Sequence, residues 1–288
     1  MQKFGNKYLI IALFFTVTIL AVAIAVMLIQ NSQKSQPEVE PNSTTSSRSV
    51  GTVSSEDTEA APTGIMWSFD GETWKAMGNV PNCPTPLTFK SPVDLSLATN
   101  VLYPGQVRGG NYKPHGGFRF DNSPTNKITV RMPIDAILWR GSRYIEAGEV
   151  QIILDFVAPC GVMIRFDHLL TLSDEFAAIV DAELPAAQPD DSRTHYFKTQ
   201  KLYRQGTLVA EEIGHTNPLN VGMDWGVYDL RAHNTQSQNT VWAQQHSTFK
   251  ETAYYAICWL DYLEKDEKTL VKALPGGGTE GKISDYCN

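Results

Sequence analysis

The chain has 288 residues, of which 42% are hydrophobic and 19% are charged, a balance that supports a sizeable buried core. Its formal net charge is -7, and the sequence shows no basic patch of the kind that binds phosphate. Composition therefore argues against a nucleic-acid partner and predicts one large domain, with or without a small appendage.

The N-terminal segment, residues 1–30, is predicted to be a membrane anchor. Tyr8 to Ile29 form an almost wholly apolar run that could span a bilayer as a helix, and Lys3 and Lys7 precede it. These lysines place the N-terminus in the cytoplasm and everything after the run outside. A cleavable signal peptide is the alternative, because small residues lie around 21–25.

Residues 31–64 are predicted to be a disordered tether, because they are rich in Ser, Thr, Pro, Glu and Gln and nearly lack aliphatic side chains. The extension at 65–100 opens with a predicted β-hairpin, since aromatic runs flank Asp70-Gly71, a dipeptide typical of tight turns. Together these segments predict a single-pass protein whose folded part is held away from the bilayer.

Strand signals dominate the main domain, residues 101–235. Runs of Val, Ile and aromatic residues bounded by Gly, Pro or Asn occur at 128–130, 136–140, 150–157, 162–166, 208–213 and 221–230. Ser173, followed by two acidic residues, predicts a capped helix over 173–182. In the C-terminal appendage, 236–288, residues 252–264 are predicted to form a helix or a strand that packs Trp259 inward. The folded part is therefore predicted to be mainly β.

The four cysteines would lie outside the membrane, where an oxidising environment favours disulfides. Four cysteines allow three pairings. Cys258 and Cys287 share the C-terminal appendage, so we expect that pair, which leaves Cys83 with Cys160. Free buried thiols are the alternative. No Cys-x-x-Cys spacing occurs, so a zinc knuckle or a thioredoxin-like site is not expected.

Three short segments carry the residues suited to chemistry. The first runs from His115 to Asp121, and as a strand it would alternate its side chains between two faces. Phe118 and Phe120 would lie on the core face. The opposite face would be polar and would carry His115, Gly117, Arg119 and Asp121. The second is a strand from Val162 that ends at His168. The third, 220–230, places Asp224, Gly226 and Tyr228 on one face.

In order and spacing, these segments resemble the lysostaphin/LytM-type zinc peptidases. In that family a His-x-x-x-Asp segment supplies two zinc ligands, and a Tyr-x-His-Leu strand supplies a catalytic His. A Gly-x-His-x-His-Phe-Glu segment supplies another catalytic-shell His and the third ligand. The strand from Ala136 and the segment 204–210 also match family strands. The resemblance covers about residues 101–231 and implies an open, mostly antiparallel β-sandwich of the duplicated hybrid motif type.

The departures from the family pattern concern the metal. His115 stands at the first ligand position and His168 at the catalytic His, but Arg119 replaces the ligand Asp and Gly226 the ligand His. Asp224 stands at the remaining catalytic-shell position. A hydrolytic zinc ion needs about three protein ligands and a water, and a guanidinium repels a cation and offers no lone pair. We therefore expect no cofactor and an ion pair between Arg119 and Asp224.

The resemblance with these departures implies a non-catalytic domain that binds peptidoglycan stem peptides or regulates a partner wall hydrolase outside the membrane. The expected groove residues are His115, Arg119, Asp121, His168, Asp224 and Tyr228. Arg119 suits the recognition of a carboxylate by paired hydrogen bonds. A vestigial groove in a structural surface protein is a further alternative.

The competing enzymatic hypothesis is a hydrolase with a rebuilt ligand set. In it His115, Asp121 and Asp224 hold zinc or another divalent ion, and His168 acts as general base. The remaining histidines have no supporting spacing and are interpreted as surface residues: His195, His215, His233 and His246. Trp225 is interpreted as a core residue.

Overall fold

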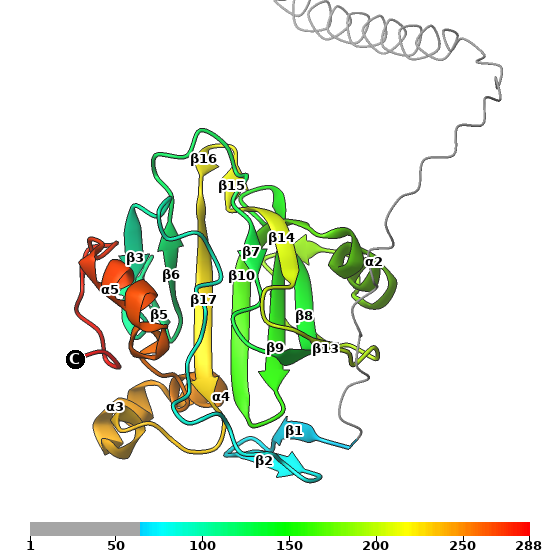
Figure 1. Cartoon of the computed structure of the whole chain (residues 1–288), viewed down its shortest axis with the longest axis vertical. Helices are drawn as coiled ribbons and strands as arrows, with labels where there is room; N and C mark the ends of the chain where they lie inside the picture. The colour runs from blue at the N-terminus through cyan, green and yellow to red at the C-terminus, as the bar shows by residue number, and fades with distance from the viewer. Residues whose placement is uncertain (1–63) are drawn as a thin grey trace, which may run out of the picture. The chain divides into compact units, whose positions relative to one another are not determined.

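The computed structural model describes residues 64–288, so the predicted anchor and nearly all of the predicted tether lie outside the described residues. Within 64–288, no helix is both long and apolar enough to cross a membrane. This part of the chain is mainly β, and its sheets are open, as Figure 1 shows. The prediction of a mainly β domain is confirmed.

The folded part begins with the predicted hairpin. Strands β1 (Met66–Phe69) and β2 (Trp74–Met77) pair antiparallel. In the turn, Asp70 Oδ1 accepts hydrogen bonds from the backbone N–H groups of Glu72 and Thr73 at 3.0 and 2.8 Å. Trp74 packs on Trp139 of the main sheet, with ring centroids 5.2 Å apart, so the hairpin is joined to the sheet by aromatic contact.

One large sheet forms the body of the domain, with strand order β11-β8-β9-β10-β17-β6-β3. All neighbours on this path are antiparallel except β11, which runs parallel to β8. The strands are β3 (Asn100–Leu102), β6 (Gly116–Arg119), β8 (Ala136–Glu146), β9 (Glu149–Ala158), β10 (Val162–Leu172), β11 (Gln188–Pro189) and β17 (Gly222–Asp229).

Shorter strands extend this sheet or stand beside it. Those off the main path are β7 (Val130–Arg131), β12 (His195–Tyr196), β13 (Leu202–Tyr203) and β14 (Leu208–Ile213). Two separate hairpins are β4 (Gln106–Arg108) with β5 (Asn111–Lys113), and β15 (His215–Thr216) with β16 (Leu219–Asn220). These two hairpins both carry residues of the candidate site described below.

One face of the sheet is an aromatic core. Phe118 and Phe120 are fully buried, as the alternation along the first segment predicts. Trp225 is fully buried too, and its ring lies 5.9 Å from that of Phe118 and 4.4 Å from that of Trp259, measured between centroids. The prediction that Trp225 and Trp259 are core residues is confirmed. The opposite face of the same strands is therefore left for polar side chains.

Helix α2 (Asp174–Glu183) lies close to its predicted range. Ser173 occupies the N-cap position, but its hydroxyl does not cap the helix and instead donates to the carbonyl of Leu208 at 2.9 Å. The expected capping bond is thus wrong, because a neighbouring strand offers that hydroxyl an acceptor. The acidic first turn, Asp174 and Glu175, still suits the positive end of the helix.

The C-terminal appendage consists of short helical turns rather than one helix or strand over 252–264. They are η1 (Gln236–Gln238), α3 (Thr240–Gln245), η2 (Ser247–Phe249), α4 (Lys250–Ala253), η3 (Trp259–Tyr262) and α5 (Lys265–Ala273). Figure 1 shows α3 and α5 on the side of the sheet where β3 and β6 lie, and α4 at the end of β17.

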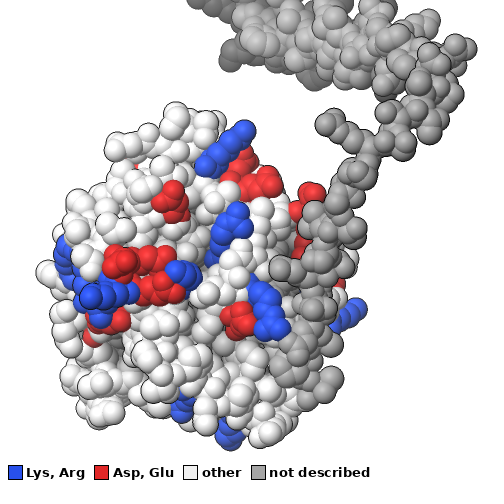
Figure 2. All heavy atoms as spheres, in the orientation of Figure 1, with Lys and Arg blue, Asp and Glu red and all other residues white. Residues whose placement is uncertain are grey.

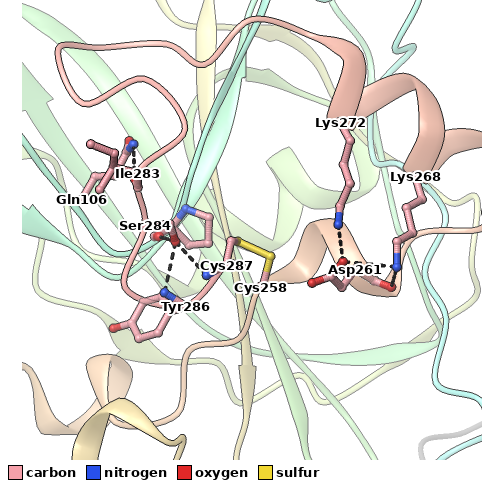
Figure 3. The surroundings of a disulfide bond; sticks show 10 residues. Gln106, Cys258, Asp261, Lys268, Lys272, Ile283, Ser284, Tyr286 and Cys287 are labelled. Atoms are coloured by element: carbon pink, nitrogen blue, oxygen red, sulfur yellow. Dashed lines mark hydrogen bonds and ion pairs between the residues drawn. A yellow bond between two sulfur atoms is a disulfide. The ribbon is translucent and has the colours of Figure 1, made fainter. Parts of the chain in front are cut away.

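Both predicted disulfides are present, Cys83–Cys160 and Cys258–Cys287. The first joins the N-terminal extension to the turn between β9 and β10. The second closes the C-terminal appendage, where Ser284 Oγ also accepts hydrogen bonds from the backbone N–H groups of Tyr286 and Cys287 (Figure 3). The first disulfide therefore attaches the N-terminal extension to the main sheet, and the second holds the C-terminal end within the appendage.

The face of the domain shown in Figure 2 carries basic and acidic side chains beside one another. Local ion pairs such as Arg193–Asp191 and Lys272–Asp261 are consistent with this mixture. Mixed charge on this face gives no broad basic surface of the kind that follows a nucleic-acid backbone.

Replacing each disulfide by a pair of serines should destabilise the domain, and Cys83–Cys160 should matter more. The bonds close loops of 77 and 29 residues, for which loop entropy corresponds to about 4–5 and about 3–4 kcal/mol respectively. Denaturant unfolding of the two double-serine variants measures the costs. A larger loss for the Cys258–Cys287 pair would contradict the loop-length argument.

Candidate functional site

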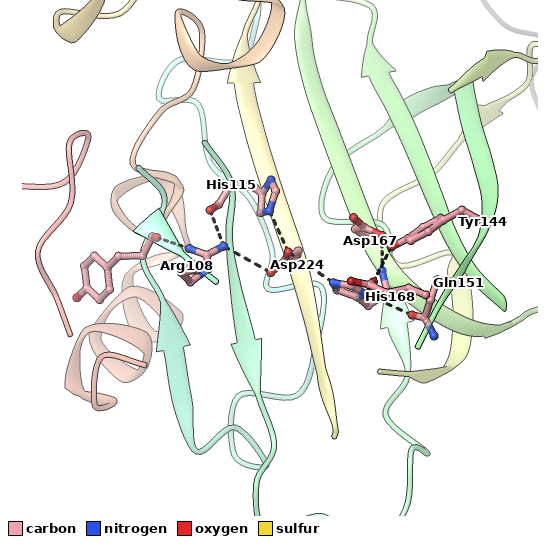
Figure 4. A network of polar contacts seen from close by, with 9 residues as sticks. Arg108, His115, Tyr144, Gln151, Asp167, His168 and Asp224 are labelled. Atoms are coloured by element: carbon pink, nitrogen blue, oxygen red, sulfur yellow. Dashed lines mark hydrogen bonds and ion pairs between the residues drawn. The ribbon is translucent and has the colours of Figure 1, made fainter. Parts of the chain in front are cut away.

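The three motif segments lie on adjacent strands of the sheet. Strand β17 pairs with β6 on one side and with β10 on the other, in the registers Asp224–Gly117 and Asp224–Asp167. Asp224 therefore stands between the start of β6, which follows His115, and the stretch of β10 that holds His168. Figure 4 shows His115, Asp224 and His168 pointing toward one another on one face of the sheet.

The centre of this site is the carboxylate of Asp224, which is 8% exposed. Its Oδ2 lies 2.9 Å from Nε2 of His115 and 3.8 Å from Nε2 of His168, while Oδ1 lies 3.5 Å from Nη2 of Arg108. Burial raises the pKa of Asp224, but His115, His168 and Arg108 outweigh burial and hold that pKa well below its ordinary value. The carboxylate is therefore ionised at neutral pH.

Arg108 reaches the site from the β4–β5 hairpin. Besides facing Asp224, its guanidinium donates hydrogen bonds to the carbonyls of Tyr103 and His115, each at 3.0 Å. It thus fixes the backbone that carries His115. Burial lowers the pKa of His115 despite the opposing effect of Asp224, which favours a neutral imidazole beside the charged Asp224–Arg108 pair.

The expected ion pair between Arg119 and Asp224 is wrong. Nε and Nη2 of Arg119 donate to Oδ1 of Asp121 at 2.9 and 2.7 Å, and Asp121 also accepts from the hydroxyl of Thr99 at 3.2 Å. Residues two apart on an extended chain share a face, so this pair forms locally, whereas Asp224 already has Arg108 and His115. Arg119 and Asp121 are both partly exposed at the end of β6.

Gly226 has a structural role in this chain. A Cβ atom built on Gly226 would lie 2.3 Å from the hydroxyl of Tyr228, so the tyrosine ring fills the space that a side chain would need. Tyr228 is fully buried in an aromatic cluster and does not line the groove, which corrects the expected groove set. Its hydroxyl has no hydrogen-bond partner among the described residues, and burial raises its pKa.

His168 occupies an irregular position in β10. Its φ is 61°, in the left-handed region that non-glycine residues rarely adopt, and the pairing of β10 with β9 shifts register between Phe166 and Leu169. Such a bulge re-aims a side chain, and strain of this kind is commonly kept at functional sites. The backbone N–H of His168 donates to Asp167 Oδ1 at 2.7 Å, and Tyr144 donates to the same oxygen at 2.7 Å.

Both nitrogens of the His168 ring face oxygen atoms. Nδ1 lies 3.3 Å from Oε1 of Gln151 and 3.5 Å from Oε2 of Glu146. Burial lowers the pKa of His168, but the carboxylates of Asp167, Asp224 and Glu146 raise it by more. The ring is therefore the point at which the acidic side chains of β8, β10 and β17 meet.

A hollow of about 110 Å³ opens beside this cluster, lined by Arg119, His168, His215, Asn220 and Asp224 among others. The prediction that His215 is a surface residue is wrong: it is half-buried, and its ring centroid lies 5.3 Å from that of His168. His246 is half-buried as well, and its ring centroid lies 3.8 Å from that of Tyr112. His195 and His233 are exposed, as predicted.

Sequence reasoning missed further residues at this site, namely Arg108, Tyr144, Glu146, Gln151, Asp167 and His215. Asp167 directly precedes His168 in the second segment, so that strand could have indicated it. Arg108, Glu146 and His215 stand in or beside hairpin turns, and no sequence periodicity places a turn against a distant strand. Only the fold brings them to His168.

Within residues 64–288, two groups of side chains have donors close enough together to hold a metal ion. One is Glu146, His168 and His215, and the other is Asp167, His168 and Asp224. The ligand set expected for a hydrolase, His115, Asp121 and Asp224, is not brought together, because Asp121 turns to Arg119 and Thr99. His168 is common to both groups.

A second buried charge cluster continues along the same face. Asp155 is fully buried and accepts hydrogen bonds from Arg140 and Arg165 at 2.7 Å, and Arg165 lies opposite Gly226 in the strand register. Burial raises the pKa of Asp155, but Arg165 and Arg140 lower it by more, so the carboxylate is ionised. Arg140 also pairs with Glu251 of α4, which links the appendage to the sheet.

Comparison of the chain with protein-family models, with curated proteins and with solved structures gives no match. The assignment of the site therefore depends on its own residues and geometry.

Introducing histidine at Gly226 should destabilise the domain by about 1–3 kcal/mol or more, because the new Cβ would overlap the Tyr228 ring. The double variant Gly226→His/Tyr228→Ala should cost less than the sum of the two single changes. Denaturant unfolding of the four proteins in this cycle measures the coupling. Additive costs would show that Tyr228 does not exclude a side chain at this position.

Asp155→Asn should cost about 3–5 kcal/mol at pH 7, because it leaves two buried guanidinium groups without their shared carboxylate. The folded-state pKa of Asp155 is lowered, so its contribution is present above the ordinary pKa near 4 and declines as pH falls below it. The stability difference from wild type should therefore shrink between pH 5 and pH 3. Asp181→Asn, which removes an exposed partner of Arg143, is the control and should change little.

Proposed function

We propose that the chain is a peptidase-like binding domain of the LytM type that works outside the membrane and does not use zinc at the family's position. The sheet carries the three motif segments on adjacent antiparallel strands, with His115, Asp224 and His168 converging on one face. This arrangement supports a fold of the duplicated hybrid motif type. In this proposal the predicted anchor and tether hold the domain beside the cell wall.

The observation that carries the proposal is the charge balance at Asp224. At the place of a catalytic-shell His, a buried carboxylate faces the guanidinium of Arg108 and the imidazole of His115. The two family positions that would complete a zinc ligand set, 119 and 226, offer a paired guanidinium and a glycine covered by Tyr228. The groove is therefore kept polar by an ion pair where the family relies on a metal ion.

The hollow beside the cluster is suited to an anionic group. It offers hydrogen-bond donors from Arg119, His168, His215 and Asn220, and Arg119 remains partly exposed. The Asp224 carboxylate also lines the hollow, but it is already paired with Arg108 and His115. Wall stem peptides carry free carboxylates, which a guanidinium binds by charge-assisted hydrogen bonds. We therefore take a carboxylate of a wall stem peptide to be the ligand.

Arg119→Ala should weaken the binding of soluble wall stem peptide to the purified chain about 10- to 100-fold, the value of one charge-assisted hydrogen bond. Arg193→Ala is the matched control, because Arg193 makes the same local pair with an acidic residue two positions away, Asp191, outside the groove. Isothermal titration with the free peptide and with its amidated form measures the effect, and amidation should weaken binding of wild type but not of Arg119→Ala.

Two outcomes would decide against this function. Equal binding by wild type, Arg119→Ala and Arg193→Ala would favour a structural surface protein with a vestigial groove. Cleavage of wall peptides by the purified chain, abolished by a chelator and restored by zinc, would favour the hydrolase.

A further inference from the structure

The two ring nitrogens of His168 face different neighbours. Nε2 faces the Asp224 carboxylate, which already contacts His115 and Arg108. Nδ1 faces away from this cluster, toward Glu146 Oε2 at 3.5 Å, and the half-buried ring of His215 lies 5.3 Å from the His168 ring between centroids. Two imidazoles and a carboxylate thus gather on the Nδ1 side of the ring.

We propose that Glu146, His168 and His215 form a binding site for a divalent transition-metal ion such as Zn²⁺, displaced from the position where the resembling peptidases hold their ion. The site goes beyond the proposed function, which needs no metal. Imidazole and carboxylate are the donors that zinc takes in three-ligand sites, where a water or a ligand fills the fourth position.

The spacing of the donors fits such an ion. One donor atom from each of the three side chains lies within 4.8 Å of the other two. Ligand atoms about 2.0–2.2 Å from a tetrahedral zinc ion are about 3.3–3.6 Å apart. The 3.5 Å between His168 Nδ1 and Glu146 Oε2 falls in that range, and a donor atom of His215 lies within 4.8 Å of the other two residues' donor atoms.

An unsatisfied polar atom points to a missing partner at the same place. Nδ1 of His215 is buried and has no hydrogen-bond partner among residues 64–288. A buried polar group in this condition normally has a protein, water or ion partner. A metal ion between His168 and His215 would supply one.

Hydrogen bonds from neighbouring residues fix the backbone around His168 and His215. Gln151 is fully buried, and its Nε2 donates to the carbonyl of Gly214, the residue before His215. Its Oε1 lies 3.3 Å from His168 Nδ1, a contact that a metal ion on this nitrogen would replace. The N–H of Gly214 donates to the carbonyl of His168 at 2.8 Å. Glu149 accepts hydrogen bonds from the backbone of Thr216 and Asn217, which fixes the other side of the β15–β16 turn.

Metal binding through Nδ1 agrees with the contact on the other side of the His168 ring. A neutral imidazole then carries its proton on Nε2, which faces Asp224 Oδ2 at 3.8 Å. A metal-bound histidine commonly directs its other N–H at a carboxylate, which orients the ring. The strained backbone of His168 is what turns the ring to face both sides, since its φ of 61° lies at the bulge of β10.

The test titrates the purified, chelator-treated full chain with Zn²⁺ and Co²⁺ by calorimetry and visible absorption. Wild type should bind one ion per chain. Glu146→Gln and His215→Ala should each weaken binding at least about tenfold, as expected for changes at a metal site. His168→Asn should do the same, and Asn tolerates the left-handed backbone at this position.

Matched controls separate this site from surface binding and from the family's zinc position. Glu211→Gln and His195→Ala alter exposed residues outside the site and should change affinity less than about twofold. His115→Gln alters the family's zinc position and should lower affinity less than Glu146→Gln and His215→Ala do. X-ray absorption at the zinc edge should show two imidazole ligands.

The proposal is overturned if wild type binds no ion at micromolar concentration, or if Glu146→Gln and His215→Ala bind as wild type does. It is also overturned if His115→Gln loses the ion while those two variants keep it. Circular dichroism of each variant shows that it is folded. Because the probe is the metal alone, failure here leaves the wall-peptide proposal standing, and the reverse holds as well.

Discussion

The antiparallel pairing of β17 with β6 and β10 is the constraint on which the site depends. It sets Asp224 opposite Gly117 on one side and opposite Asp167 on the other. The approach to β6 is close, because a Cβ on Gly117 would lie 2.2 Å from the carbonyl oxygen of Met223. Glycine at this position lets the strands meet, so three segments separated in the chain present their polar side chains on one face.

Burying charge on this face requires that each carboxylate have cationic partners. Asp224 has Arg108, with the neutral imidazole of His115 beside them, and Asp155 has Arg140 and Arg165. Removing one member of such a group leaves an uncompensated charge in a region with little water, which costs more than the group contributes when it is complete. The face can therefore stay polar and hollow, while the aromatic core on the other face stabilises the sheet.

His168 connects the two polar regions that we propose to have separate roles. Its bulged, left-handed backbone directs one ring nitrogen to Asp224 and the other to Glu146 and Gln151. The hollow lined by Arg119 and Asn220 lies beside the same ring. A ligand carboxylate in the hollow and a cation bound by His168 and His215 would thus be neighbours, each measurable by itself.

The sequence by itself determined the mainly β class, the hairpin at Asp70-Gly71, the core role of Phe118, Phe120, Trp225 and Trp259, and both disulfides. These follow from local turn chemistry, from the two-residue alternation of strands and from the grouping of cysteines, none of which requires knowledge of distant neighbours. Strands β8 and β10 are longer than predicted, because they continue to Glu146 and Leu172 through polar residues beyond the apolar runs that end at 140 and 166.

Only the tertiary structure decided which charges meet. We expected Arg119 to pair with Asp224, but it pairs with Asp121. The guanidinium beside Asp224 is that of Arg108, which belongs to a hairpin without any of the three motif segments. Glu146 and His215 reach His168 from turns whose positions depend on sheet register and on bonds made by Gln151 and Glu149. An ion pair depends on distances of a few ångströms between side chains far apart in the chain, and periodicity along one strand contains no information about those distances.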